Sequence, residues 1–390
     1  MTFDLTAARR DTPGTEKCIH LNNAGAALMP TPVYHAVVDH LDLEMKMGGY
    51  EAHARALPAF ERTYDAISEL INCDRSEIAL VENATAGWMM AFHGLRLKAG
   101  DRILTTEAEY ASNVITYLQA AKNKGVVIDV VPSDSDGQID VTVLEAMIDD
   151  TVKLISMTHI PTNGGLINPA AAVGKIARKY KIPYLLDACQ SVGQIPIDVE
   201  EIGCDMLSAT GRKYLRAPRG TGFLYVKRAF MDQLEPPFLD LHSANWTATD
   251  AYEMRDDARR FENWEFNFAA TIGLGVAVDY FLETGVKEAT DRLSLLAATA
   301  REKLSALPKI QVHDVGKNKG GMVTFSHTGL SADEIKSKLA QVSINVSTST
   351  TASTRYDMEK RDLSNIVRAS FHYYNSEEEL EKFLSFVGNF

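Results

Sequence analysis

Short, unbroken apolar runs alternate with helix-like stretches from about Ile78 to Val226. The runs read IALV, RILTT, VVIDVV, KLISMTHI, YLLDA, MLSAT and GFLYV, and they begin at residues 78, 102, 126, 153, 184, 206 and 222. Runs rich in β-branched residues are typical of parallel strands that are covered on both faces. Because helical segments such as AAAVGKIARKY separate them, the pattern predicts an α/β domain with a mostly parallel, seven-stranded sheet.

The pattern changes near residue 261. Two long helical stretches, ATIGLGVAVDYFLETG (270–285) and LSLLAATAREKLSAL, precede three predicted strands at 321–327, 343–349 and 366–374. Ser376 and Glu379 then have the spacing of a capping box at the start of a final helix. We therefore expect a large domain at residues 21–260 and a smaller α+β domain formed by residues 1–20 and 261–390.

Composition narrows the class of protein. The 390 residues include 52 acidic and 40 basic side chains, and the resulting net charge of -12 argues against nucleic-acid or anionic-membrane partners. The first fourteen residues contain no apolar core of a signal peptide, and no apolar run is long enough to span a bilayer. Four scattered cysteines without a CxxC pair indicate neither a disulfide framework nor a metal site. We expect a cytoplasmic protein without a bound metal.

Polar residues follow two of the predicted strands. Asp187 and Gln190 come at the end of YLLDA, and Lys213 comes just past MLSAT. Alone, Asp187 is typical of a turn and Lys213 of a solvated surface. Together with the Thr-Ala-Gly helix start at 85–87 they meet the needs of pyridoxal phosphate: a lysine for the aldehyde, an acid for the ring nitrogen and a helix N-terminus for the phosphate.

Six segments in one order carry a closer resemblance. They read LNNAGAALMP, ENATAGWMM, THIPTNGGLINP, DACQSVGQIPIDV, SATGRKYLRAPRGTGFLYV and VRASFHYYNSEEEL. From about Leu21 to the C-terminus the chain resembles the class V aminotransferase family, which includes cysteine desulfurases, selenocysteine lyases, isopenicillin N epimerase and C–S lyases. The resemblance implies the type I fold of pyridoxal-phosphate enzymes, a small-molecule amino-acid substrate and a homodimer.

The resemblance also implies roles for individual residues. Lys213 would be the catalytic lysine that forms the Schiff base, Asp187 would hold the ring nitrogen, and Gln190 would bind the ring hydroxyl. The remaining roles are phosphate binding (Ala84, Thr85, Thr210 and Arg212), stacking on the ring (Tyr110) and substrate binding (Asn23, Asn163 and Arg368). The family usually has histidine at the positions of Arg212 and Tyr110. Asn23 and Asn163 could equally be loop residues.

Two departures from the family pattern bear on the reaction. Cysteine desulfurases carry a cysteine on a loop before the RAS strand, but residues 343–370 of this chain contain none. Trp264-Glu265 replaces a Gly-Thr pair whose threonine reaches the partner subunit's phosphate, which suggests a larger or cationic substrate. Cys189, between Asp187 and Gln190, is expected to be a buried packing cysteine.

These features predict a C–S β-lyase that acts on a cysteine derivative without forming a persulfide on the enzyme. The segments LNNAG and SATGRKYLRAPRG are nearest the C–S lyase and isopenicillin N epimerase branch. Transamination and epimerisation by the same cofactor stay open, because both begin from the same carbanion. A catalytically inactive binding protein with this fold is a further alternative, against which Lys213, Asp187 and Arg368 together argue.

Overall fold

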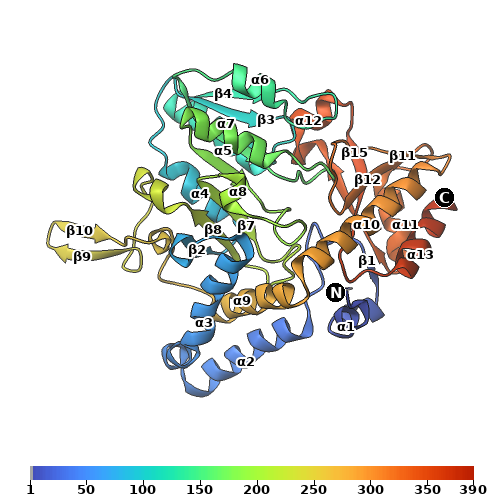
Figure 1. Cartoon of the computed structure of the whole chain (residues 1–390). Coiled ribbons are helices and arrows are strands. Elements are labelled where there is room, and N and C mark those ends of the chain that lie inside the picture. The colour runs from blue at the N-terminus through green and yellow to red at the C-terminus, as the bar shows by residue number, and fades with distance from the viewer. Residues whose placement is uncertain (1–2) are drawn as a thin grey trace.

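The computed structural model describes residues 3–390, and a seven-stranded sheet forms its centre (Figure 1). The strand order is β2-β8-β7-β6-β5-β3-β4, and only β8 runs against the others. The bounds are β2 (Ile78–Val81), β3 (Arg102–Thr106), β4 (Val127–Val131), β5 (Val152–Thr158), β6 (Tyr184–Asp187), β7 (Met206–Thr210) and β8 (Gly222–Val226). The predicted mostly parallel sheet is confirmed.

Both faces of this sheet are buried, as the unbroken apolar runs require. Neighbouring residues such as Leu185 and Leu186 belong to two different hydrophobic clusters, one on each side. On one side lie α4 (Ala84–Gly94) and α5 (Ala111–Lys124), and on the other lie α7 (Ala170–Tyr180) and α8 (Val199–Ile202). The short helix α6 (Val141–Ala146) connects β4 to β5.

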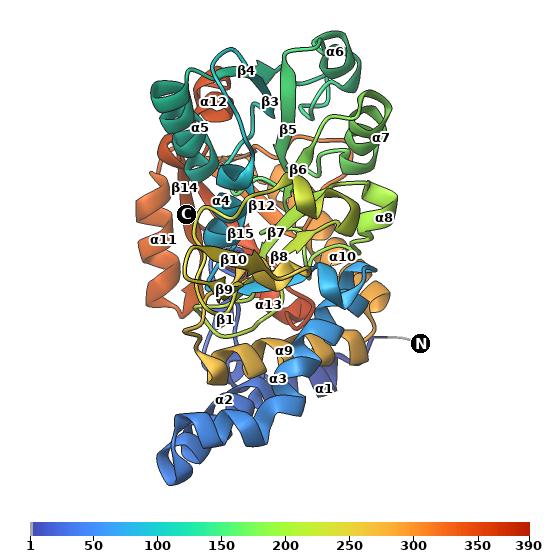
Figure 2. The same cartoon turned by 90° about the vertical axis from the view of Figure 1, so that its left-hand side faces the viewer.

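Three long helices extend the large domain beyond the sheet. The helices α2 (Thr31–Met47) and α3 (Gly49–Ile71) pack against α9 (Phe268–Glu283), and Figures 1 and 2 both show the three together beneath the sheet. Pro58 lies inside α3 without ending it. No single helix among residues 3–390 is long and apolar enough to cross a bilayer; α9 and α10 would pass that test as a pair, but they are bent by 83° at their junction.

A second sheet lies beside the first, with the order β11-β12-β15-β14. Its strands are β11 (Ile310–Val312), β12 (Met322–His327), β14 (Ser347–Thr350) and β15 (Asn365–Ser370). The helices of this part are α10 (Val286–Ser305), α11 (Ala332–Gln341), α12 (Arg355–Lys360) and α13 (Glu377–Gly388). A parallel pair, β1 (Ile19–His20) and β13 (Ile344–Asn345), ties the N-terminal segment, with α1 (Leu5–Arg10), to the small sheet.

Several predicted boundaries in the C-terminal part differ from the structure. The strand expected at 366–374 ends at Ser370, because the chain turns there and Asn375 accepts a hydrogen bond from the N–H of His372. The segment 343–349 forms two strands, β13 and β14, rather than one. The capping box of α13 is confirmed: the Ser376 hydroxyl accepts from the N–H of Glu379, whose carboxylate accepts from the N–H of Ser376.

The packing of α9 bears on the domain boundary predicted at residues 260/261. Ile272, Leu274 and Val278 of α9 belong to the hydrophobic cluster that includes Leu186 of the large sheet, whereas Leu296 of α10 belongs to the cluster of the small sheet. We propose that the boundary lies near Gly285, between α9 and α10, instead of before α9.

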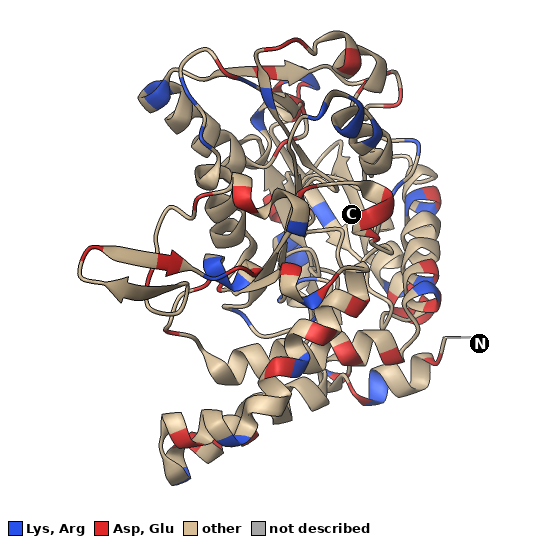
Figure 3. Cartoon of the chain, turned by 60° about the vertical axis from the view of Figure 1, so that its left-hand side comes forward, with Lys and Arg blue, Asp and Glu red and all other residues tan. Residues whose placement is uncertain are grey.

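A hairpin projects from the body on the side away from the small sheet (Figure 1). It consists of β9 (Ala244–Ala248) and β10 (Ala251–Met254), and its Trp246 is 80% exposed. Acidic and basic residues are interspersed over the helices, as Figure 3 shows, so the net negative charge is spread over the described molecule.

Candidate active site

A pocket lies at the carboxyl ends of β5, β6 and β7, where open α/β sheets bind ligands. The residues that line it are Asn83, Ala84, Thr85, Tyr110, Thr158, Ile160, Thr162, Asp187, Cys189, Gln190, Arg212 and Lys213. The structure thus brings together seven of the residues predicted from the sequence: Ala84, Thr85, Tyr110, Asp187, Gln190, Arg212 and Lys213. Thr210, Asn23, Asn163 and Arg368 do not line this pocket directly.

Asp187 is the last residue of β6 and is buried in the pocket wall. Its Oδ1 accepts from the N–H of Cys189 at 2.9 Å, and its Oδ2 accepts from Nδ2 of Asn113 at 3.0 Å. Burial raises the pKa of Asp187, while these two hydrogen bonds and the charge of Lys213 act in the opposite direction. A buried carboxyl of this kind is suited to a cationic N–H group of a ligand.

Lys213 follows β7 on a tightly packed loop, and its Nζ donates to Sγ of Cys189 at 3.3 Å. Cys189 was expected to be a buried packing cysteine, but it is only half-buried and lines the pocket. The chain turns directly after Asp187 and thereby aims the thiol at the lysine. Burial raises the pKa of Cys189, and the nearby positive charge of Lys213 only partly opposes that effect.

The start of α4 forms another wall of the pocket. Asn83 caps the helix by accepting from the N–H of Ala86, so the N–H groups of Ala84 and Thr85 stay available to an anion. Arg212 reaches the same region and donates from Nη1 to Oγ1 of Thr210 at 3.1 Å. Thr210 therefore supports Arg212 from behind the pocket wall.

Gln190 and Tyr110 complete the part of the pocket nearest the lysine. Nε2 of Gln190 donates to the carbonyl oxygen of Ala24 at 3.1 Å, but its buried Oε1 has no partner in the described chain. Tyr110 is half-buried at the start of α5. An orphaned amide oxygen beside an aromatic ring fits a planar ligand that carries a hydroxyl group.

Arg368 reaches the pocket through Thr162. It lies on β15, is 7% exposed, and donates from Nη1 to both the carbonyl oxygen and Oγ1 of Thr162, at 2.8 Å each. Its Nε has no partner within residues 3–390. Burial lowers the pKa of Arg368 from its usual value. An incompletely paired, buried guanidinium is suited to a carboxylate.

Asn23 and Asn163, both predicted to bind substrate, are engaged within the protein instead. Asn23 is fully buried, and its Nδ2 donates to the carbonyl oxygens of His20 and Ser370 while its Oδ1 accepts from the hydroxyl of Tyr374. Nδ2 of Asn163 donates to Asp357 of α12 at 2.6 Å. Both side chains thus bond to residues of the C-terminal part of the chain, Ser370 and Asp357, and a direct substrate contact stays a prediction.

Trp264 and Glu265 are exposed and do not line the pocket of their own chain. The N–H of Trp264 donates to Oδ2 of Asp240 at 2.7 Å. Sequence reasoning missed Asn113 and Thr162, which hold Asp187 and Arg368. Thr162 lies within the quoted segment THIPTNGGLINP, and Asn113 comes three residues after Tyr110, but their contacts depend on pairing between strands and helices that the linear pattern does not show.

The residues present fit pyridoxal phosphate. The observations that decide this are the orphaned oxygen of Gln190, the available N–H groups at the start of α4 beside Arg212, and a lysine and a buried acid in one pocket. Ala84, Thr85 and Arg212 would hold the phosphate, and Asp187 the ring nitrogen. Lys213 would bind the aldehyde carbon, and Gln190 the ring hydroxyl.

Comparisons with known proteins agree with this fit. The family model "Aminotransferase class-V" matches residues 19–383. A protein of Methanothermobacter thermautotrophicus named "Probable cysteine desulfurase" is 27% identical over 379 residues, which are 96% of this chain and 94% of that protein. The apo structure of cysteine desulfurase from Thermococcus onnurineus NA1 is 27% identical, with a TM-score of 0.93, and the match covers 100% of this chain and 98% of that one.

A further solved structure is the cystine C–S lyase C-DES in complex with its reaction product, cysteine persulfide. It is 22% identical, with a TM-score of 0.88, and the match covers 97% of this chain and 99% of that one. At this identity the likeness shows the fold. With a family match over most of its length and a pocket that fits the cofactor, the chain belongs to the class V aminotransferase family and is a pyridoxal-phosphate-dependent enzyme.

Proposed function

We propose that the enzyme is a C–S β-lyase that acts on an S-substituted cysteine. The overall reaction converts the cysteine derivative and one water molecule into pyruvate, ammonia and a thiol. The α-proton is removed, the Cβ–S bond breaks with its electron pair leaving on sulfur, and water hydrolyses the resulting enamine. No oxidant or reductant is needed.

Three residues of the site are suited to the first step, removal of the α-proton. Bound pyridoxal phosphate supplies the electron sink for the negative charge that develops at the α-carbon. Lys213, inside the pocket, takes the α-proton, and Asp187 holds the ring nitrogen in its protonated form. Arg368, with its unpaired Nε, orients the substrate carboxylate beside Thr162.

The observation that carries this proposal is the lack of a thiol on the loop before β15. The relatives named cysteine desulfurase suggest sulfur chemistry, but the family's persulfide cysteine falls in a segment, residues 343–370, that contains no cysteine here. Ser349 lies at the edge of the site, since its hydroxyl donates to the carbonyl oxygen of Thr162 at 3.4 Å. A hydroxyl there cannot take over sulfur as a thiolate does.

Cys189 is not a substitute for that cysteine. Reactive cysteines have a lowered pKa, whereas burial raises the pKa of Cys189, whose Sγ accepts a hydrogen bond from Nζ of Lys213. The thiol is therefore positioned to contact the cofactor and to pack beside Lys213.

The test compares wild type with Cys189→Ser on S-substituted cysteines and measures pyruvate and alanine. The proposal predicts pyruvate in both proteins, with kcat within about tenfold, because a lyase needs no enzyme thiol. Cys73→Ser, at a cysteine away from the pocket, is the control for general loss of stability. Alanine as the main product of wild type, lost in Cys189→Ser, would show a desulfurase that uses Cys189.

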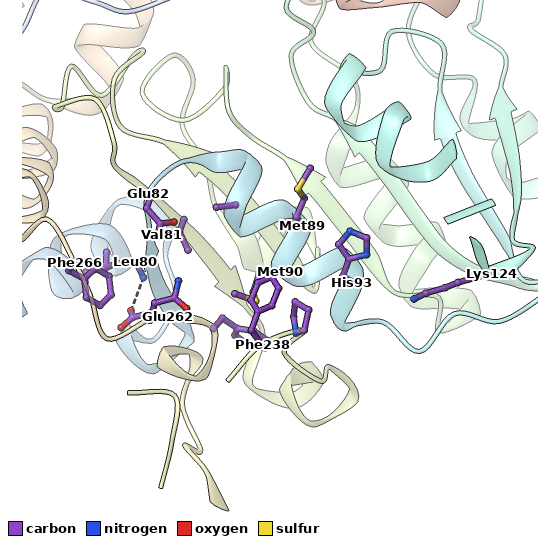
Figure 4. Close-up of a pocket in the computed structure, with 14 residues that line it drawn as sticks. Leu80, Val81, Glu82, Met89, Met90, His93, Lys124, Phe238, Glu262 and Phe266 are labelled. Atoms are coloured by element: carbon purple, nitrogen blue, oxygen red, sulfur yellow. Dashed lines mark hydrogen bonds between the residues drawn. The ribbon is translucent and has the colours of Figure 1, made fainter. Parts of the chain in front are cut away.

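We further propose that the enzyme works as a homodimer through the face near the hairpin. A cavity of about 660 Å³ lies there, lined by Met89, Met90 and His93 of α4 together with Phe238 and Phe266 (Figure 4). Exposed apolar side chains continue from it: Phe238 is 68% exposed and Leu241 69%. Large exposed apolar surfaces of this kind mark protein interfaces. Because α4 also begins at the pocket, a second copy bound here would lie next to both active sites.

The four cysteines are free in the structure. We propose a reducing, cytoplasmic location for the enzyme on that basis. Cell fractionation tests this directly, since recovery of the protein with an oxidising compartment would contradict it.

A further inference from the structure

A second buried acid lies behind Asp187. Glu109, in the connection between β3 and α5, is 1% exposed and does not line the pocket. Its Oε1 accepts from the N–H of Tyr110 at 2.9 Å, and its Oε2 accepts from Oγ1 of Thr105 at 3.0 Å and the N–H of Thr158 at 3.1 Å. The hydroxyl of Thr158 also donates to Oε1. None of the partners that residues 3–390 give this carboxyl is a cation. Burying the ionised carboxylate therefore costs free energy that only neutral hydrogen-bond donors offset.

One amide group joins Glu109 to Asp187. Nδ2 of Asn113 lies 2.9 Å from Oε1 of Glu109 and 3.0 Å from Oδ2 of Asp187. An amide NH₂ group has two hydrogens, and here each points to a different carboxylate. Glu109 thereby fixes the amide, and the amide fixes the orientation of Asp187 toward the pocket.

Titratable and charged groups face this pair of acids both from α5 and from the pocket. Tyr117 of α5 lies beside Glu109, and Cys189 and Lys213 face Asp187 from the pocket side. Burial, and secondly the charge of Asp187, raises the pKa of Glu109 to about 7, and burial raises that of Asp187. Two acids joined in this way titrate as a pair, and both shifts favour uptake of a proton as the pH falls through about 7.

We propose that Glu109 is a second acid of the cofactor site, which positions Asp187 through Asn113 and adds its negative charge behind the ring nitrogen of pyridoxal phosphate. In the cofactor-free enzyme the pair takes up a proton as the pH falls through neutrality. When a protonated ring binds against Asp187, that proton leaves to solvent, and both carboxylates face the ring cation. Glu109 is thus a positioning residue that acts through Asn113.

The test is calorimetric binding of pyridoxine 5'-phosphate, which has no aldehyde and arrives with its ring nitrogen protonated, to the cofactor-free enzyme. Titration in two buffers of different ionisation enthalpy counts the protons released on binding. A parallel titration with inorganic phosphate measures how many of those protons come from binding the phosphate group. Wild type should release about one proton below about pH 7 and fewer above it, so its affinity rises with pH through this range. This measurement needs no variant, and no proton release by wild type would overturn the proposal.

The second part of the experiment repeats these titrations with the Glu109→Gln variant. This variant should bind the probe roughly tenfold more weakly at about pH 8, and its affinity, once the share of the phosphate group has been subtracted, should not rise between about pH 6 and about pH 8. Glu107→Gln is the matched control: it lies on the same connection, but its carboxylate pairs with Lys360 and Ser133. Glu107→Gln should behave as wild type. A Glu109→Gln protein that keeps the wild-type pH profile would reduce Glu109 to a structural hydrogen-bond acceptor and contradict the proposal.

Discussion

The functional side chains of this enzyme are oriented by hydrogen bonds to neighbouring residues. Asp187 depends on Asn113 and on the N–H of Cys189, and Arg368 depends on Thr162. These supporting contacts orient the charged groups before any ligand arrives, so that binding does not have to order them.

Arg368 offers the sharpest prediction at this scale. Arg368→Ala should raise KM for an S-substituted cysteine by about 10- to 100-fold, because a charge-assisted hydrogen bond to the substrate carboxylate is lost. Visible absorption of the bound cofactor should stay unchanged. Arg355→Ala, at an exposed arginine of α12 that pairs with Glu359, is the control. An Arg368→Ala enzyme with wild-type KM would remove Arg368 from the substrate site.

Roles were hardest to predict from the sequence for residue types that are also common in loops, such as asparagine. Lys213, Asp187 and Gln190 follow strand ends, so the sheet topology brought them together as expected. Asn23 and Asn163 follow the family pattern equally well, but their amides bond to Ser370 and Asp357. Which way an amide points depends on residues more than a hundred positions away, and local patterns hold no such information.

At the scale of elements, loops between strands and helices set the geometry of the pocket. Gly211 opens the loop that carries Arg212 and Lys213, and it lies in a crowded place: an added Cβ would lie 2.3 Å from Oγ1 of Thr221, 2.8 Å from Cβ of Ala217 and 3.0 Å from Leu274. Thr221 is held by its own hydrogen bond to Pro218, so it cannot simply give way.

Gly211→Ala should therefore displace the lysine loop. The expected result is weaker retention of the cofactor and a loss of about 1–3 kcal/mol in the free energy of unfolding, measured by denaturant titration and by the visible absorption of dialysed enzyme. Gly49→Ala is the matched control, since an added Cβ there meets nothing within 4 Å at the start of α3. Equal stability and cofactor content in the two variants would show that the loop accommodates the added methyl group, and would contradict this prediction.

The strands of the large sheet were predictable because each is a short apolar run buried on both faces. The helix α2 was harder to predict, since its exposed face carries apolar residues such as Leu41 and Met45, which blur the helical period. The early end of β15 depends on the turn that follows Ser370, and the ring-bearing residues FHYY (371–374) extended the predicted strand past it.

At the scale of the whole molecule, the exposed apolar face near the hairpin predicts association. Sedimentation at micromolar concentration should give twice the monomer mass of 43.0 kDa. Phe238→Glu combined with Leu241→Glu should shift the enzyme toward monomer, because charges placed on the face oppose its burial. Leu295→Glu, at a residue 65% exposed on α10, is the control. A wild-type monomer would contradict the dimer.

The most direct test of the whole account is to mix the purified enzyme with an S-substituted cysteine while following visible absorption and the products. We expect an absorption band from cofactor bound to Lys213, absent in Lys213→Ala. We also expect a change in that band on adding substrate, with pyruvate, ammonia and thiol in equal amounts. Conversion of the band to that of the amine form of the cofactor, without pyruvate, would contradict the lyase and show a transaminase.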